Sequence, residues 1–517
     1  MTTAATATTP PQNSARSIAG IRAVLSSPLR WWLPLLLILI FFASRIPFLT
    51  ELPLHNDEGL HLTRAVEVWN LHPFWEIGDG KIVNHLAIAL FYPQNAPVFA
   101  GRIATIFISV LGLAAAFAIG RRLSGNTGGA LVAILWICSP YIFFYERLAF
   151  SDAEAGALVV VAIAANLKLA RSGALRDAVL TGFWLALAVL FKFTAAPYAL
   201  SMLLITMLLP EYAMRRRLIM LMVIALTGIV MFVVPLAYLI LRREPLFEIA
   251  LGWIGVGSSQ VQGAGLSGNI TRFITLIATF GVPLWAVLTA VGLALLGIFR
   301  RKTGIILLAA ALIPFLLTIT LGREVLPRHF AAALPILVTL SGAGLSAVII
   351  KLPTLPRRSL ASGIAILLAV PFALFAITAY DAPQDLPLPL EIRAEHITDH
   401  SSGFGLRAAV FNFPRLVTEP DAVIIASMFP DSCRRANFEA APGYEMICTA
   451  APGIEAITQA LEMHPAVYVL ADTAPLIGAD IPALASELGI MAEQIGVYPR
   501  PGELPENASV VLWKLSR

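Results

Sequence analysis

Long apolar runs are the feature of this sequence that most restricts how it can fold. A helix needs about 20 mostly apolar residues to cross the hydrocarbon core of a bilayer. Eleven such runs occur, near residues 31–49, 97–119, 127–145, 152–170, 177–196, 198–210, 218–241, 272–299, 303–321, 329–350 and 359–380. They predict a polytopic α-helical membrane protein with about eleven transmembrane helices.

The composition agrees with this interpretation. Hydrophobic residues make up 58% of the chain and charged residues 13%, and the mean hydropathy is +0.80. A soluble domain is about 25% charged. These values exclude a disordered or collagen-like chain and argue against an entirely soluble enzyme. Three cysteines are too few for a disulfide framework.

Basic residues predict the orientation, because lysine and arginine concentrate in cytoplasmic loops. Residues 1–29 form a polar tail, expected to be disordered and cytoplasmic; the apolar run after it is too long for a cleaved signal peptide. Alternate loops then carry most of the bases, namely Arg121 and Arg122, Lys168, Arg171 and Arg176, residues 215–217, residues 300–302, and Lys351, Arg357 and Arg358. An odd number of crossings places residues 381–517 outside the cytoplasm. We expect a multi-pass cell-membrane protein, of bacterial origin.

Acidic residues cluster at the ends of helices that should face outward. The long first outer loop, about residues 50–96, begins with the pair Asp57 and Glu58, followed by a pattern typical of an amphipathic interfacial helix. Asp152 and Glu154 lie in a short loop at the membrane rim, where a carboxylate is costly and usually has a function. Both groups have a simpler explanation, since carboxylates are also favoured at helix N-termini.

Cations gather at the same outer helix ends, and they are Arg45, Arg147, Lys192, Arg323, Arg328 and His329. Lys192 interrupts an apolar run, which snorkelling to the interface would also explain. Cations can neutralise a phosphate leaving group, while a carboxylate can activate a nucleophile. The combination predicts a site for a phosphate-bearing lipid on the outer face.

The order and spacing of these residues resemble the GT-C superfamily of membrane glycosyltransferases. The likeness is strongest to glycosyltransferase family 39, which includes protein O-mannosyltransferases and lipid A aminoarabinose transferases. It extends over about residues 30–350. The matching elements are Arg45-x-Pro, Asp57-Glu58, Arg102, Arg121-Arg122-Leu123, Ser139-Pro140, Arg147-x-Ala149-x-x-Asp152, Lys192-x-Thr194, and Arg328-His329 with Pro335.

The resemblance implies a GT-C-like fold for residues 30–380 and an inverting transfer of sugar from a polyprenyl-phosphate donor to an acceptor hydroxyl. It implies a catalytic group of Asp57, the general base, with Glu58 and Asp152. We expect substrate contacts from Arg45, His55, Arg147, Glu154, Lys192, Arg323, Arg328 and His329. It further implies no cofactor or metal, no nucleic-acid partner, and a lipid, glycan or protein as acceptor.

Two other classes stay open at the level of sequence. A polysaccharide polymerase or ligase should have its large outer loop late in the bundle, whereas here it follows the first helix. A lipid-linked sugar flippase should carry ionisable groups at mid-membrane and internal repeats. A nucleotide-sugar donor is disfavoured, because no glycine-rich phosphate loop follows a strand.

Residues 381–517 differ in character from the rest of the chain. They carry 8 basic and 18 acidic residues, against 28 and 14 before them. Strands are predicted at 422–426, 466–470 and 509–515, and helices at 454–463 and 481–488. This pattern predicts a small extracytoplasmic α/β domain. Cys433 and Cys448 are candidates for a disulfide in an oxidising compartment, whereas Cys138 should be a packing residue.

Overall fold

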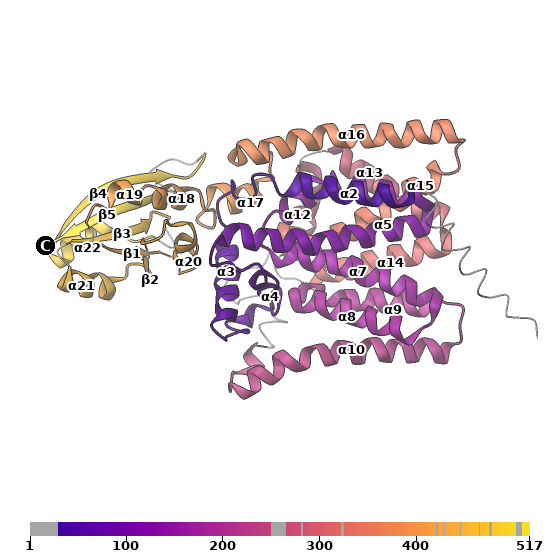
Figure 1. The fold of residues 1–517 in the computed structure, drawn as a ribbon, viewed down its shortest axis with the longest axis horizontal. Helices are drawn as coiled ribbons and strands as arrows, with labels where there is room; N and C mark the ends of the chain where they lie inside the picture. The colour runs from indigo at the N-terminus through magenta and orange to yellow at the C-terminus, as the bar shows by residue number, and fades with distance from the viewer. Residues whose placement is uncertain are drawn as a thin grey trace, which may run out of the picture.

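The computed structural model describes residues 29–249, 265–280, 283–321, 325–419, 422–428, 430–444, 446–464, 466–474, 478–502 and 509–517. It consists of a bundle of apolar helices and a smaller domain built on a β-sheet, joined end to end (Figure 1). The sheet domain and the long first loop lie at the same end of the bundle, which we call the domain end.

The helices of the bundle follow the apolar runs of the sequence. They are α2 (Leu29–Arg45), α5 (Pro97–Ile137), α6 (Pro140–Glu146), α7 (Ser151–Ser172), α8 (Leu175–Phe191), η2 (Phe193–Tyr198), α9 (Ala199–Leu208), α10 (Met214–Leu241), α12 (Gly265–Thr279), α13 (Pro283–Phe299), α14 (Arg301–Leu321), η3 (Pro327–Ala332), α15 (Leu334–Ile349) and α16 (Thr354–Asp381). By length and composition, five of the described helices could each cross a membrane, or six if the α12–α13 pair, bent by 114°, is one span. Shorter apolar helices, among them α2 and α15, complete the bundle.

Helix α5 contains two of the expected crossings, because the chain reverses within it. Ser124 and Gly125 leave helical geometry, and Gly125 has a φ of 70°, which favours glycine. After the turn the two halves pack closely: a Cβ placed on Gly120 would lie 2.6 Å from the carbonyl oxygen of Gly128. The expected runs at 97–119 and 127–145 are therefore two antiparallel segments.

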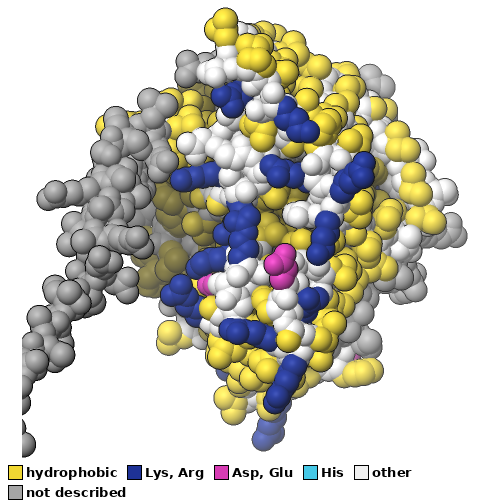
Figure 2. Space-filling view, turned by 90° about the vertical axis from the view of Figure 1, so that its right-hand side faces the viewer, with side chains coloured by type: hydrophobic (Ala, Val, Ile, Leu, Met, Phe, Trp, Pro, Cys, Tyr) yellow, Lys and Arg dark blue, Asp and Glu magenta, His cyan; other side chains and the backbone are white. Residues whose placement is uncertain are grey.

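The face opposite the domain end carries many lysine and arginine side chains and few acidic ones (Figure 2). We call it the basic end. The bundle is thus polarised along its length, with bases at one end and the acidic sheet domain at the other.

The first loop folds over the domain end as short helices. It contains α3 (Asn56–Trp69), η1 (Ile77–Asp79) and α4 (Asn84–Ala89). The amphipathic helix expected after Asp57 and Glu58 is α3.

A linker of short helices connects the bundle to the sheet domain. These are η4 (Pro383–Asp385), α17 (Leu390–Arg393) and η5 (Ala394–Thr398). The domain continues with α18 (Phe404–Phe411), α19 (Phe413–Leu416), β1 (Val423–Ser427), α20 (Pro430–Glu439), β2 (Met446–Thr449), α21 (Ile454–Met463), β3 (Ala466–Asp472), α22 (Ile481–Leu488), β4 (Met491–Pro499) and β5 (Ser509–Ser516).

The five strands form one mixed sheet in the order β2-β1-β3-β5-β4. Strands β2, β1 and β3 are parallel, and β5 and β4 add an antiparallel edge. Buried clusters lie on both faces, as expected for an α/β domain. The structure joins Cys433 of α20 to Cys448 of β2 in a disulfide. Cys138 is free and buried in the bundle core.

Helix α20 attaches the sheet domain to the first loop by packing against α3. Arg435 is buried there and donates to the carbonyl oxygens of Leu54 and Ser401, at 3.2 and 2.6 Å. Ser432 donates to the side chain of Asn56 at 3.1 Å. The domain is therefore fastened beside the first turn of α3, where the acidic pair lies.

Candidate active site

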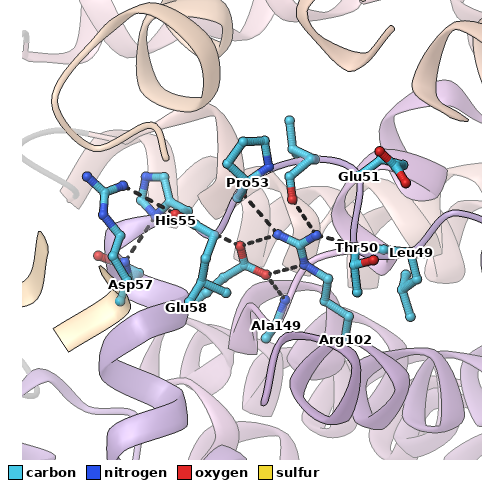
Figure 3. A network of polar contacts seen from close by, with 12 residues as sticks. Leu49, Thr50, Glu51, Pro53, His55, Asp57, Glu58, Arg102 and Ala149 are labelled. Atoms are coloured by element: carbon cyan, nitrogen blue, oxygen red, sulfur yellow. Dashed lines mark hydrogen bonds and ion pairs between the residues drawn. The ribbon is translucent and has the colours of Figure 1, made fainter. Parts of the chain in front are cut away.

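The acidic pair occupies the first turn of α3, and its two side chains point to different surroundings (Figure 3). His55 is the N-cap, and its Nδ1 accepts a hydrogen bond from the backbone N–H of Asp57 at 3.1 Å. The Glu58 carboxylate accepts from the backbone N–H of His55 at 3.0 Å, which completes a capping box.

Glu58 is fully buried and its carboxylate is saturated with donors. Arg102 of α5 binds both oxygens at 2.8 Å, and the backbone N–H of Ala149 donates to one at 2.7 Å (Figure 3). The remaining guanidinium hydrogens of Arg102 go to loop carbonyl oxygens. Glu58, which was expected in the catalytic group, therefore fixes the start of α3 to the bundle in this structure.

Arg45 and Arg147 also differ from the expectation that they bind substrate. Arg45 is fully buried, pairs with Glu146 at 2.9 Å and donates to the carbonyl oxygen of Ile137 at 2.9 Å. Arg147 donates to three carbonyl oxygens of residues 45–48, at 2.6, 2.8 and 2.7 Å. Both arginines therefore hold the chain where it leaves α2.

Asp57 lies in a second cluster, in which charges share their partners. Lys81 and Arg328 each approach one of its carboxylate oxygens to 3.3 Å. Lys81 also pairs with Asp79 at 3.2 Å, and Arg328 with Glu395 at 2.5 Å. The Asp57 side chain is 26% exposed, so this carboxylate, unlike that of Glu58, can be reached from outside.

The charges in this cluster control each other's ionisation. Burial alone would raise the pKa of Asp57, but the positive charges of Arg328 and Lys81 hold it well below its usual range. Burial alone would lower the pKa of Lys81, yet Asp57 and Asp79 raise it above its usual value. Asp57 is therefore ionised at neutral pH, and Lys81 stays charged.

The linker between the two parts of the molecule completes the site. Glu395 of η5 lies 3.7 Å from Nε2 of His55, and the ring of His396 lies 4.9 Å from that of His55. Burial, followed by the charge of His396, lowers the pKa of His55 well below its usual value. Burial lowers the pKa of His396 to about 3, so both rings are neutral at neutral pH.

Asp152 and Lys192 form a neighbouring ion pair at 2.5 Å, at the domain ends of α7 and α8. Both residues were expected at the site. The positive charges of Lys192 and Arg328 both lie near the ring of His329. Glu154, two residues beyond Asp152 along α7, is buried and accepts from Thr105 at 3.3 Å. It belongs to the interior of the bundle.

Of the expected site residues, the structure thus brings together Asp57, His55, Asp152, Lys192, Arg328 and His329. The side chains of Glu58, Arg45, Arg147 and Glu154 have structural partners instead. Arg323 lies outside the described residues. Sequence reasoning missed Lys81, Asp79 and Glu395. A lysine after Gly80 in a largely apolar stretch was the one available signal for Lys81, whereas Glu395 lies in a linker far along the chain.

The described part of the chain contains no group of three His, Cys, Asp or Glu side chains arranged to hold a metal ion. Lys81 of the first loop and Arg328 of η3 place positive charges beside Asp57, and the charge of Lys192, after α8, lies near both of these cations.

Comparison with known proteins gives a family match over part of the chain and a fold over nearly all of it. Residues 83–239 match the family described as dolichyl-phosphate-mannose-protein mannosyltransferase. A structure of ArnT from Cupriavidus metallidurans bound to undecaprenyl phosphate is similar over 94% of this chain and 98% of its own, with a TM-score of 0.62 and 14% identity. The chain shares the fold of this GT-C glycosyltransferase.

Two further GT-C structures extend the comparison. The apo state of ArnT from Cupriavidus metallidurans matches with a TM-score of 0.59 and 14% identity, over 94% of this chain and 98% of that one. The arabinofuranosyltransferase AftD from Mycobacteria matches with a TM-score of 0.50 and 15% identity, over 94% of this chain and 41% of that one. A search of curated protein sequences gave no match. The family match and the fold together indicate an enzyme of the GT-C glycosyltransferase type.

Proposed function

We propose that this protein transfers a sugar from a polyprenyl-phosphate-linked donor to an acceptor hydroxyl at the domain end of the bundle, with inversion at the anomeric carbon. The observation that carries the proposal is the partly exposed Asp57 carboxylate held between Lys81 and Arg328. It combines a base for the acceptor with cations for a phosphate. That one similar structure is bound to undecaprenyl phosphate supports a polyprenyl donor.

The proposed reaction begins with an exchange of ion pairs. A donor phosphate that binds Lys81 and Arg328 competes with Asp57 for the same two cations. When these cations turn to the phosphate, the pKa of Asp57 rises from its depressed value, because their charges caused the depression. Donor binding thus converts Asp57 from an ion-paired carboxylate into a competent base.

Asp57 then takes the proton of the acceptor hydroxyl while the hydroxyl oxygen attacks the anomeric carbon. The bond from that carbon to the phosphate oxygen breaks, and its electron pair leaves with the polyprenyl phosphate. Lys81 and Arg328 stabilise the developing negative charge, and Lys192 adds a third positive charge nearby. We propose that these side chains suffice without a metal ion or other cofactor.

We propose that the domain end faces away from the cytoplasm in a cell membrane. The basic end opposite fits the rule that cytoplasmic loops are rich in lysine and arginine (Figure 2). Lipid-linked donors are presented in the plane of the membrane, where the rim of the bundle can receive them. The acceptor would be a lipid, glycan or protein that reaches this face.

The test is transfer of radiolabelled sugar from polyprenyl-phosphate donors to a panel of lipid, glycan and peptide acceptors by the purified protein. Asp57→Asn should lose about 10²- to 10⁴-fold of the transfer rate, the usual contribution of a general base. Glu51→Gln, an exposed acidic residue of the same loop, is the matched control and should keep full activity. Full transfer by folded Asp57→Asn protein would refute the base. Movement of the intact donor across vesicles without transfer would indicate a flippase instead.

A further inference from the structure

A cavity opens at the domain end, between the C-terminal part of α3 and that of α10. Its volume is about 650 Å³, within the range of small-molecule sites. One wall is the segment from His72 to Gly78, and the other is the domain end of α10 with the residues that follow it. None of these residues takes part in the proposed chemistry.

One side of this cavity is aromatic, with Phe74, Trp75 and Tyr238 lining it. The rings of Phe74 and Tyr238 lie edge to face with centroids 5.2 Å apart, which joins the first loop to α10. Arg434 of the sheet domain lies over the Trp75 ring, 5.1 Å from its centroid. The aromatic wall is therefore held by three separate parts of the fold.

The polar lining consists mainly of hydrogen-bond acceptors. Three carboxylates line the cavity, and two of them already have partners: Glu67 lies 3.0 Å from His72, and Glu76 pairs with Arg434 at 3.3 Å. An ionised carboxylate only accepts hydrogen bonds, so the complementary ligand must bring hydroxyl or ammonium donors. Among the described residues Glu244 has no ion pair, so it is the lining carboxylate most available to such a donor.

The cavity is coupled to the candidate active site through two segments. Glu67 lies ten residues beyond Asp57 on the same helix, a rise of roughly 15 Å. Gly78 precedes Asp79, which pairs with Lys81, the partner of Asp57. A ligand that filled the cavity could reach Asp57 only if it extended beyond one sugar ring.

The backbone around the cavity is held in a costly conformation. Glu76 has a φ of 50°, which is uncommon for a residue with a side chain and is often found at functional sites. The Arg64 guanidinium, which also pairs with Asp79 at 3.1 Å, donates to the carbonyl oxygen of Glu76. The same arginine thus connects the wall of the cavity to the Lys81 network.

We infer that this cavity binds a saccharide unit of the acceptor, one or more units away from the hydroxyl that Asp57 activates. A sugar ring has apolar C–H faces for the aromatic wall and hydroxyl or amino donors for the carboxylates. That the bound saccharide belongs to the acceptor rests on the proposed function. Saccharide binding to the cavity can be measured without any transfer.

Binding is measured by calorimetry or ligand-observed NMR on the full-length protein in detergent. The probes are maltose, cellobiose, mannobiose and the β-linked glucosamine dimer, with a lysine-containing serine peptide as the competing class. Wild type should bind at least one disaccharide, and Glu244→Gln should bind it roughly tenfold more weakly, the usual effect of a charged hydrogen-bond partner. Trp75→Phe should weaken it as well.

Glu248→Gln is the matched control, because Glu248 is exposed and close in sequence but does not line the cavity. It should bind like wild type. No binding by any disaccharide, equal binding by Glu244→Gln, or binding of the peptide alone would each overturn the inference. Disaccharide binding by a wild type that transfers no sugar would leave the cavity as a saccharide site and refute the transferase proposal.

Discussion

The charges around Glu58 and those around Asp57 lie within one turn of α3, but they are paired in different ways. Glu58 and Arg102 are fully buried, and their hydrogen-bonding capacity is filled by each other and by backbone groups. Around Asp57, by contrast, two cations are each shared between two carboxylates, and Asp57 and Asp79 are partly exposed.

This difference separates a structural group from a reactive one. Breaking a saturated buried pair leaves an uncompensated charge with no other partner, so such a pair cannot exchange partners during a reaction. A cation shared between two carboxylates can leave one of them for a phosphate while keeping the other. The Asp57 cluster can therefore respond to a ligand, whereas the Glu58 cluster holds it in place.

The largest effect that would test this comparison concerns Glu58. Glu58→Gln should leave Arg102 buried without a counter-charge and lower the free energy of unfolding by about 3 to 5 kcal/mol. Thermal unfolding in detergent measures it, with Asp57→Asn as the neighbouring control, expected to change stability much less. A stable Glu58→Gln protein that had lost only transfer activity would break the comparison, because Glu58 would then belong to the reactive group.

Lys81 gives the next largest effect, on activity rather than stability. Lys81→Ala removes one phosphate partner, and the KM for donor should rise about 10- to 100-fold, as for a charged hydrogen bond. Lys81→Arg should recover part of this loss. Lys302→Ala, at the basic end, serves as the control for a lost positive charge.

The same variant should change the pH profile in a defined direction. Cations hold the pKa of Asp57 below its usual range, so wild-type kcat/KM should stay constant until the pH falls to that low pKa. Without Lys81 the pKa of Asp57 rises, and the acidic loss of activity should move to higher pH. An unchanged acidic limb in Lys81→Ala would show that Asp57 is not the titrating base.

Much of the fold could be predicted from the sequence, because the pattern that indicates a helix or strand lies within the segment that forms it. Apolar length located the helices, and the expected strands at 422–426, 466–470 and 509–515 correspond to β1, β3 and β5. The helices expected at 454–463 and 481–488 are α21 and α22. Strand β4 was missed because its largely exposed surface gives no buried apolar run, and β2 because it is only four residues long.

The candidate site was harder to predict, since charge in a sequence does not reveal its partner. Arg45, Arg147 and Arg328 look alike as cations at helix ends. Yet Arg45 pairs with Glu146, Arg147 binds backbone carbonyls after α2, and Arg328 reaches Asp57. Glu395 enters the site only because the linker folds back over α3. Such contacts depend on tertiary structure, and no local pattern in the chain indicates them.

Glu395 provides the smallest expected effect and the finest test of shared pairing. Glu395 and Asp57 both pair with the guanidinium of Arg328. Burial raises the pKa of Glu395, Arg328 opposes this rise, and the negative charge of Asp57 adds to it. Glu395→Gln removes the charge that competes for Arg328, so the pKa of Asp57 should fall further and its basicity at neutral pH should decrease. We expect a two- to fivefold loss of kcat, the size of a modest ion-pair interaction.

The pH profile distinguishes this role from a purely structural one. In Glu395→Gln the acidic limb of kcat/KM should move to lower pH, opposite to Lys81→Ala, because one variant strengthens and the other weakens the positive field at Asp57. Glu391→Gln, in the same linker and paired with Arg272 instead, should leave the limb in place. Equal shifts in both linker variants would mean that the linker acts through its packing and that Arg328 is not shared in the working enzyme.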